Sequence, residues 1–387
     1  MIPERHLIER RILSALRVSP PRIPIILGGC GSGLTSVLLR VHDLLKPDVC
    51  QYIDAERITT TPEGFLRTIT TTSPYHSETY TKGATYGSST REAYSKILSF
   101  LSNTRQTETL PATFLIDDIL ELKTFENFPG LRDVLQNFLK AVSLSTNHFV
   151  LSTRYVTRAH RLLGNSSSQF EVIHLPPLTP LEVTKTLSTY GFQSGPQLDE
   201  LGRTIQTLTD GRPSYVRALA ESMLAINQYD PVSALAAQLE PGGQLYSICR
   251  FCYELRLNRA RGHGTLKAIL EILSEAEPLT LTEISQRLRR TPGSTRDYLS
   301  WLEDVDLVTV RQKRYSFTDP LLRLWVRIHC RPMQPKESDL ALEIQNYAFA
   351  RLPYIEPSVG LIAQSENTET LAADVKQDKS WGMIEID

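Results

Sequence analysis

Short apolar runs alternate with longer amphipathic segments along the first half of the chain. Residues 1–20 carry apolar positions at helical spacing, and similar segments separate the apolar runs that follow. Strands that alternate with helices in this way predict an α/β fold with a parallel sheet covered by helices on both faces. The expected strands lie at residues 23–27, 50–56, 113–120, 148–154 and 171–175.

The second half of the chain has a different pattern. From the Pro-Pro break at 176–177 to the turn-rich residues 240–244 the apolar spacing is helical, which predicts a small helical lid. From residue 264 onwards, three helical segments and a two-strand hairpin follow in an order typical of a winged helix. Residues 70–91 and 364–387 lack apolar periodicity and predict a long surface loop and a polar tail.

A glycine cluster joins the strand at 23–27 to the helix that follows it. Gly28 and Gly33 have the G-x-x-x-x-G spacing of a phosphate loop. In such a loop the glycines let backbone N–H groups wrap round a phosphate, and the helix directs its positive N-terminal end at the same charge. Thr35 stands where a hydroxyl ligates magnesium. The residues expected to contact nucleotide are Gly28, Gly29, Cys30, Gly31, Ser32, Gly33, Leu34, Thr35 and Ser36.

Leu34 occupies the place of the lysine that normally reaches the outer phosphates. A hydrogen bond to a charged group contributes about 1.5 to 3 kcal/mol, so losing the lysine weakens nucleotide binding by roughly tenfold to a hundredfold. Hydrolysis suffers more, because the lysine stabilises charge on the transferred phosphoryl group. The alternative is a glycine-rich turn that packs closely and binds nothing.

Two carboxylates close the apolar run TFLIDDIL at 113–120. A strand followed by an acid is the pattern that a magnesium-positioning Asp117 requires, and Asp118 is placed to orient a water molecule for catalysis. The next strand ends in Ser152 and Thr153, which either sense the outer phosphate or only meet solvent.

Three arginines follow that strand end, at Arg154, Arg158 and Arg161. One of them is a candidate for contacting the nucleotide of a neighbouring subunit. The interpretation we favour from the sequence is that they solvate a helix face.

Overall charge and cysteine content limit the classes of function. With 42 basic and 43 acidic residues the formal charge is −1, which excludes binding to a polyanion through bulk charge. The N-terminus has no secretion signal and no apolar stretch reaches eighteen residues, so we expect a cytoplasmic protein without a membrane span. An odd count of five cysteines favours reduced thiols, and the CxxC of Cys249 and Cys252 lies in an apolar helix, where core thiols are expected.

The predicted winged helix carries basic residues on its third helix and hairpin. The candidate DNA contacts are Arg296, Arg311, Lys313 and Arg314. Acidic residues beside the same helix, including Asp297 and Asp304, dilute the positive field. Contact with DNA and contact with a protein partner are therefore both retained as expectations.

The order of these motifs resembles that of AAA/STAND ATPases, especially archaeal-type and origin-recognition-like ATPases. The phosphate loop, TFLIDDIL, LSTR at 151–154, HLPPLTPLEV at 174–183 and TDGRPSYVRAL at 209–219 occur in the family's order, over roughly residues 1–332. The resemblance implies that Gly211-Arg212-Pro213 is the family's Gly-x-Pro lid element, with Pro213 beside the nucleotide. It also implies ATP and Mg²⁺ as ligands.

Pattern and resemblance together give a division of the chain. We expect an N-terminal helix at 1–20, a P-loop NTPase core at 21–175, a helical lid at 176–245, a winged-helix domain at 246–332 and a C-terminal helix with a polar tail at 333–387. The function expected is a nucleotide-dependent switch. It controls either the assembly of the protein, for example into a homo-oligomer, or its binding to DNA or to a protein partner. The sequence leaves ATP hydrolysis open. The alternative is a non-hydrolysing adaptor that acts through its winged helix.

Overall fold

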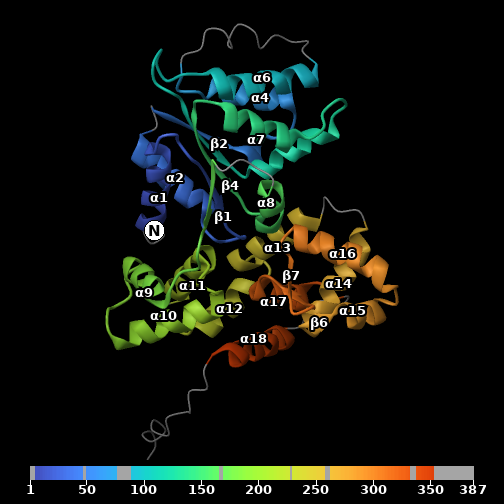
Figure 1. The fold of residues 1–387 in the computed structure, drawn as a ribbon. Coiled ribbons are helices and arrows are strands. Elements are labelled where there is room, and N and C mark those ends of the chain that lie inside the picture. The colour runs from blue at the N-terminus through green and yellow to red at the C-terminus, as the bar shows by residue number, and fades with distance from the viewer. Residues whose placement is uncertain are drawn as a thin grey trace, which may run out of the picture. The chain divides into compact units, whose positions relative to one another are not determined.

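A five-stranded parallel sheet forms the centre of the N-terminal half (Figure 1). The computed structural model describes residues 5–46, 49–75, 89–164, 169–226, 229–257, 262–331 and 337–352. The strand order is β2-β3-β4-β1-β5, which places the carboxyl ends of β1, β3 and β4 side by side. The strands are β1 (Ile23–Leu27), β2 (Cys50–Asp54), β3 (Thr113–Asp117), β4 (His148–Thr153) and β5 (Phe170–His174).

Helices cover both faces of this sheet, because alternate strand residues are apolar on each side. On one face, Ile26 and Val150 pack with α1 (His6–Arg17) and α2 (Leu34–Leu45). On the other face, Ile25 and Leu151 belong to the larger cluster that includes residues of three helices. These are α4 (Pro62–Thr71), α6 (Thr90–Asn103) and α7 (Val134–Leu144). The predicted α/β fold is confirmed.

Local signals explain where several of these helices begin. Thr61 caps α4 by accepting a hydrogen bond from the Gly64 amide at 3.0 Å, with Pro62 in the first turn. Two short helices were not anticipated, because each begins inside a run that the sequence analysis assigns to a strand. They are α3 (Ala55–Ile58) and the 3-10 helix η1 (Ile119–Asn127). The short helix α8 (Val156–Leu163) lies where the sequence analysis places arginines on a helix face.

The predicted surface loop at 70–91 is not a loop over its whole length, because the residues that the structure describes there are partly helical or buried. Helix α4 continues to Thr71, and the Tyr75 side chain is buried, where its hydroxyl donates to the Thr113 carbonyl at 2.7 Å. Residues 76–88 lie outside the described residues, and so does the predicted polar tail at 364–387.

The predicted helical lid consists of four helices, and a fifth leads out of it. Each of the four begins with proline, whose fixed φ suits the first helical turn. They are α9 (Pro180–Thr189), α10 (Pro196–Thr209), α11 (Pro213–Ile226) and α12 (Pro231–Leu239). The turn at residues 240–243 leads into α13 (Gln244–Leu257), which carries the CxxC pair.

The last part of the described chain has the helix, helix, helix, hairpin order that the sequence predicts, with one additional short strand. Its elements, which we call the C-terminal module, are α14 (His263–Glu275), β6 (Leu279–Thr280), α15 (Leu281–Leu288), α16 (Pro292–Asp304), β7 (Val308–Arg311) and β8 (Arg314–Phe317). The strands form an antiparallel sheet in the order β6-β8-β7. Helices α17 (Pro320–His329) and α18 (Glu337–Arg351) follow. No helix in the described ranges is long and apolar enough to span a bilayer.

Candidate nucleotide-binding site

The loop between β1 and α2 has the backbone of a phosphate-binding turn. Gly31 and Gly33 have φ of 77° and 86°, a left-handed conformation that glycine adopts without steric cost. Gly33 is the N-cap of α2, and the amides of the first helical turn have no partner within the helix. The predicted loop therefore presents backbone donors at a helix N-terminus, the arrangement that binds anions.

Thr35 and Asp117, the two residues predicted to position magnesium, are in direct contact. The Thr35 hydroxyl donates to Oδ2 of Asp117 at 2.7 Å, and the Tyr52 hydroxyl donates to the same oxygen at 3.0 Å. The Ser152 hydroxyl donates to Oδ1, so the buried carboxylate is fixed by three hydroxyl groups. Ser152 thus orients Asp117, a role that neither sequence interpretation of this residue anticipated.

The donor set at this point suits a magnesium ion bound with a nucleotide. Mg²⁺ takes one or two protein oxygens and completes its octahedron with phosphate oxygens and waters. Among the described residues no group of three His, Cys, Asp or Glu side chains forms a cage for a metal. A hydroxyl and a carboxylate beside a phosphate loop are what a nucleotide-bound Mg²⁺ requires.

Leu34 is buried rather than placed over the loop. Its side chain is 7% exposed and belongs to the apolar cluster that also contains Ile12 and Leu38. The first residue of α2 therefore contributes to packing beneath α1 and supplies no charge to the phosphate loop.

Asp118 lies in a buried ion-pair network. Its backbone is left-handed at φ 54°, and its carboxylate accepts hydrogen bonds from the amide of Arg154 at 3.1 Å and from Nε of Arg154 at 3.0 Å. The same guanidinium pairs with Glu56 through Nη2 at 2.5 Å. Burial raises the pKa of Asp118 to about 6, although the positive charge of Arg154 opposes this shift. Asp118 is next to Asp117, and the predicted roles of Asp117 in positioning magnesium and of Asp118 in orienting water both stay predictions.

Two of the three arginines after β4 make ion pairs within the chain. The expectation of a solvated helix face is wrong for Arg154, whose side chain is 14% exposed between Asp118 and Glu56. Arg161 pairs with Asp304 of α16. Arg154 is not solvated because it directly follows β4, which pairs with β3 and brings the arginine to Asp118. Arg161 meets Asp304 because α8 packs against α16 of the C-terminal module, which the sequence spacing does not indicate.

The Gly-Arg-Pro element joins the lid to the phosphate loop. Gly211 has φ 62°, and a Cβ there would lie 2.3 Å from the Leu178 carbonyl oxygen, so only glycine fits. Nη1 of Arg212 donates to the Cys30 carbonyl at 2.6 Å and lies 3.2 Å from the Asp319 carboxylate. The Ser214 amide donates to the Gly31 carbonyl at 3.2 Å.

A disulfide bond connects Cys30 of the phosphate loop with Cys252 of α13, with their Cα atoms 6.7 Å apart. The expectation of reduced thiols is wrong for this pair, because two cysteines separated by 222 positions are brought together by tertiary packing. Cys50, Cys249 and Cys330 are free, and Cys249 is buried as expected for a core thiol.

A pocket of about 360 Å³ opens beside the loop, between the core, the lid and the C-terminal module. Arg256, Asp306 and Asp319 are among its lining residues that were missing from the predicted site. Asp319 had a local signal as the cap of α17, whereas Arg256 and Asp306 have none. The lining residues are Gly29, Cys30, Ser32, Val156, Leu175, Pro176, Pro177, Asp210, Arg212, Pro213, Arg256, Asp306, Thr318 and Asp319.

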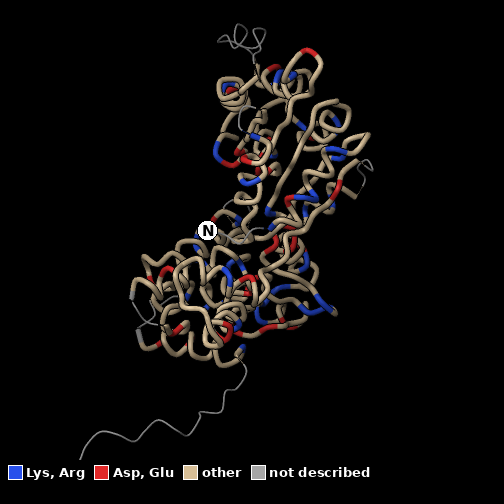
Figure 2. The backbone as a smooth tube through the Cα atoms, turned by 90° about the vertical axis from the view of Figure 1, so that its left-hand side faces the viewer, with Lys and Arg blue, Asp and Glu red and all other residues tan. Residues whose placement is uncertain are grey.

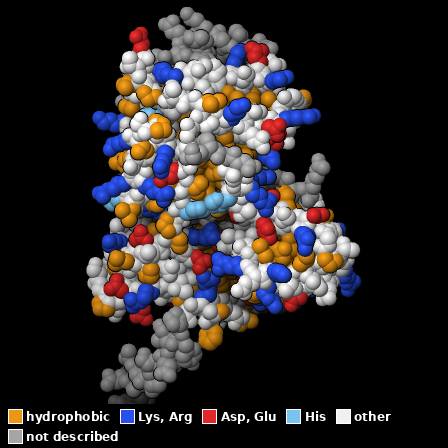
Figure 3. Space-filling view, viewed as in Figure 1, with side chains coloured by type: hydrophobic (Ala, Val, Ile, Leu, Met, Phe, Trp, Pro, Cys, Tyr) orange, Lys and Arg blue, Asp and Glu red, His pale blue; other side chains and the backbone are white. Residues whose placement is uncertain are grey.

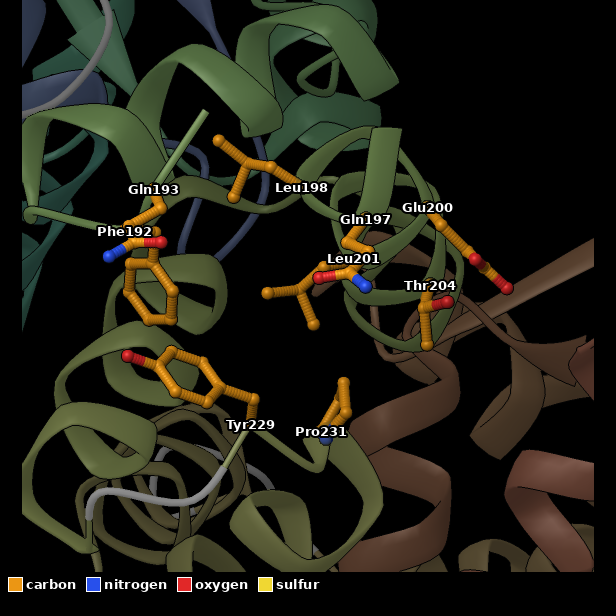
Figure 4. A pocket seen from close by; sticks show the side chains of 9 residues that line it. All are labelled: Phe192, Gln193, Gln197, Leu198, Glu200, Leu201, Thr204, Tyr229 and Pro231. Atoms are coloured by element: carbon orange, nitrogen blue, oxygen red, sulfur yellow. The ribbon is translucent and has the colours of Figure 1, made fainter. Parts of the chain in front are cut away.

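A second pocket, of about 520 Å³, lies within the lid (Figure 4). Figure 4 shows the rings of Phe192 and Tyr229 next to each other, and they pack edge to face with centroids 5.5 Å apart. Leu198 and Leu201 of α10 also line it. None of its lining residues belongs to the predicted nucleotide site.

The candidate DNA contacts Arg296, Arg311, Lys313 and Arg314 are all exposed. Arg314 lies 3.7 Å from Glu283, however, and its Nη1 donates to the Pro278 carbonyl. Acidic and basic positions are interspersed along the backbone in Figure 2, and the face seen in Figure 3 also mixes both signs with apolar side chains. DNA contact at these residues stays a prediction.

Known proteins provide a comparison for this arrangement. No family model matches the sequence, and no curated protein matches it. A Walker-type ATPase of Pyrococcus abyssi is 16% identical and superposes with a TM-score of 0.62 over 84% of this chain and 96% of its own. This chain has the fold of a P-loop ATPase. Two looser matches follow. The ORC1 protein of Aeropyrum pernix in complex with DNA is 17% identical, with a TM-score of 0.44 over 84% of this chain and 92% of its own. A STAND protein with a tetratricopeptide repeat sensor from Pyrococcus horikoshii is 18% identical, with a TM-score of 0.35 over 89% of this chain and 45% of its own.

Proposed function

We propose that this chain is an ATP-binding switch of the AAA/STAND kind, in which nucleotide at the phosphate loop controls how the lid and the C-terminal module are held. The residues that would hold ATP with Mg²⁺ are the backbone of Gly28–Ser36, Thr35 and Asp117, with Pro213 at the edge of the pocket. When bound, Mg²⁺ would neutralise charge on the outer phosphates.

The observation that carries this proposal is the direct contact between the phosphate loop and the distant parts of the chain. Arg212 contacts the Cys30 carbonyl on one side and the Asp319 carboxylate and Thr318 carbonyl on the other. A phosphate that enters the loop competes for the same guanidinium, because Arg pairs readily with phosphate oxygens. Occupancy of the loop is thereby coupled to the segment that begins α17.

Binding is better supported than turnover. Leu34 supplies no charge, and the carboxylate of Asp118 is paired with Arg154 instead of facing an open pocket. We therefore propose that hydrolysis, where it occurs, is slow, and that the bound state itself is the signal. The C-terminal module would present that signal to a DNA or protein partner, or to another copy of the chain.

Calorimetry with ATP and Mg²⁺ tests the proposal. We expect binding by the wild type, and a loss of at least about tenfold in affinity for Asp117→Asn measured with Mg²⁺ but a smaller loss measured in EDTA. Asp199→Asn, an exposed acid on α10, is the matched control and should bind as the wild type does. If the wild type binds no nucleotide, the switch is excluded and the non-hydrolysing adaptor remains.

A further inference from the structure

We infer that Arg256 supplies the positive charge that the phosphate loop lacks, and that it binds the phosphate groups of the nucleotide from the C-terminal side of the site. The inference rests on the proposed nucleotide site and assigns a residue that no motif marks. Arg256 is in the last turn of α13, far in sequence from the loop, and it lines the same pocket as Gly29, Cys30 and Ser32.

The Arg256 guanidinium is a buried charge that lacks an anion. Its side chain is 4% exposed, Nη1 donates to the Asp306 carbonyl at 3.1 Å, and its planar group lies 5.9 Å from the Tyr155 ring centroid. Nε and Nη2 are buried and have no hydrogen-bond partner. A buried arginine with two unpaired donors is costly unless an anion satisfies them.

The carboxylates around the pocket do not satisfy this charge, because each is engaged elsewhere. Asp319 accepts from the Tyr215 hydroxyl and pairs with Arg212, and Asp210 pairs with Arg351. The Asp306 carboxylate accepts from the amide and hydroxyl of Thr157. Within the described part of the chain no carboxylate lies within ion-pair distance of Arg256. Burial and the nearby cations Arg212 and Arg154 also lower the pKa of Arg256. This shift is consistent with a positive charge that no carboxylate of the described residues balances.

The geometry directs this charge to the phosphate loop. Cys252, one turn before Arg256 on α13, is bonded to Cys30, so this face of α13 is fixed against the loop. Ser32 of the loop also has a buried hydroxyl without a partner. Unsatisfied donors from two distant segments therefore line one pocket, and a phosphate group has the oxygens to pair with both.

This placement accounts for the missing lysine. Leu34 is part of the apolar cluster beneath α1, whereas Arg256 presents a permanent positive charge in the pocket that the loop lines. Because the charge comes from α13, phosphate binding would hold α13 and the C-terminal module in place.

Binding of ATP, tripolyphosphate and adenosine to matched variants tests the assignment. We expect Arg256→Met to lose about tenfold to a hundredfold in affinity for ATP and tripolyphosphate, and to bind adenosine as the wild type does. Arg256→Lys should retain most of the affinity because it keeps the charge. Arg250→Met removes an exposed arginine of the same helix that pairs with Glu254 at 2.9 Å, and should match the wild type.

Thermal stability without nucleotide separates a phosphate-binding role from a structural one. A buried charge without an anion is unfavourable, so Arg256→Met should melt at or above the wild-type temperature while losing the increase that ATP produces. Adding Leu34→Lys should restore more affinity to Arg256→Met than it adds to the wild type.

Three outcomes would overturn the assignment. The first is that Arg256→Met binds ATP with wild-type affinity. The second is that Arg256→Met loses equal affinity for ATP and for adenosine. The third is that Arg256→Met melts at a much lower temperature without ligand, and that Arg256→Lys restores this temperature with no change in ATP affinity. A wild type that binds neither ATP nor tripolyphosphate would contradict the nucleotide site itself. Binding by the wild type with no effect of Arg256→Met would contradict only the role of Arg256.

Discussion

At the scale of single residues, the end of β3 holds two carboxylates with opposite environments. Asp117 accepts three hydroxyl hydrogen bonds and faces Thr35 of the phosphate loop. Asp118 is equally buried but depends on the Arg154 guanidinium, and desolvation raises its pKa to about 6 despite that partner. One carboxylate is thus fixed by hydroxyl groups beside the phosphate loop, whereas the other has a pKa raised to about 6.

The raised pKa of Asp118 predicts a pH effect on stability. Because the folded pKa exceeds the ordinary value of 3.8, the contribution of Asp118 to stability is fully present below about pH 4 and is lost as the pH rises through about 6. Between pH 5 and pH 7.5 the wild type should lose about 1 kcal/mol of unfolding free energy relative to Asp118→Asn. Urea denaturation at the two pH values measures the difference, with Asp199→Asn as control. Parallel pH dependence of wild type and Asp118→Asn would contradict it.

At the scale of secondary-structure elements, several helices are completed by residues from other parts of the fold. Helix α8 has no capping side chain at its own N-cap, Tyr155. Instead, Asp306 from the loop after α16 accepts from the Thr157 amide at 3.1 Å and from the Thr157 hydroxyl at 2.6 Å. The C-terminal module therefore caps a helix of the P-loop core, which explains why α8 forms without a local start signal.

Removal of this external cap should destabilise the core. We expect Asp306→Ala to lower the free energy of unfolding by about 1 kcal/mol, the usual effect of losing an N-cap carboxylate. The exposed Asp297 lies on α16 in the same module, and Asp297→Ala should leave stability unchanged. Amide hydrogen exchange locates the effect, and faster exchange confined to α16, with α8 unaffected, would speak against capping by Asp306.

At the scale of the whole molecule, the phosphate loop contacts several elements that are far from it in the sequence. It contacts the lid through Ser214 and Arg212, α13 through the disulfide of Cys252, and the start of α17 through Arg212 and Asp319. This arrangement supports the proposed switch, because a change at the loop acts on several elements at once.

Reduction of the Cys30–Cys252 disulfide should loosen this arrangement. A cross-link that spans 222 positions restricts the unfolded chain and stabilises by up to about 5 kcal/mol, so a reductant should lower the melting temperature by about 5 to 10 °C. Cys252→Ser should melt lower without reductant and show no further fall, whereas Cys330→Ser should respond as the wild type does. Thiol titration of the denatured, unreduced protein should detect three thiols. Five thiols there would contradict the cross-link.

Sequence alone determined the α/β fold and its strands. The strands β1, β3 and β4 are short, almost wholly buried apolar runs, and such runs can be recognised from consecutive residues of the sequence. It also placed Thr35 and Asp117 in one site, since the carboxyl ends of parallel strands share an edge of the sheet. The cap of α8 could not be predicted, because it is Asp306, a residue far away in the sequence. Only the tertiary structure decided which distant groups meet the loop: the Cys30–Cys252 bond, the pairing of Arg154 and the approach of Arg256 all depend on contacts between segments far apart in the sequence.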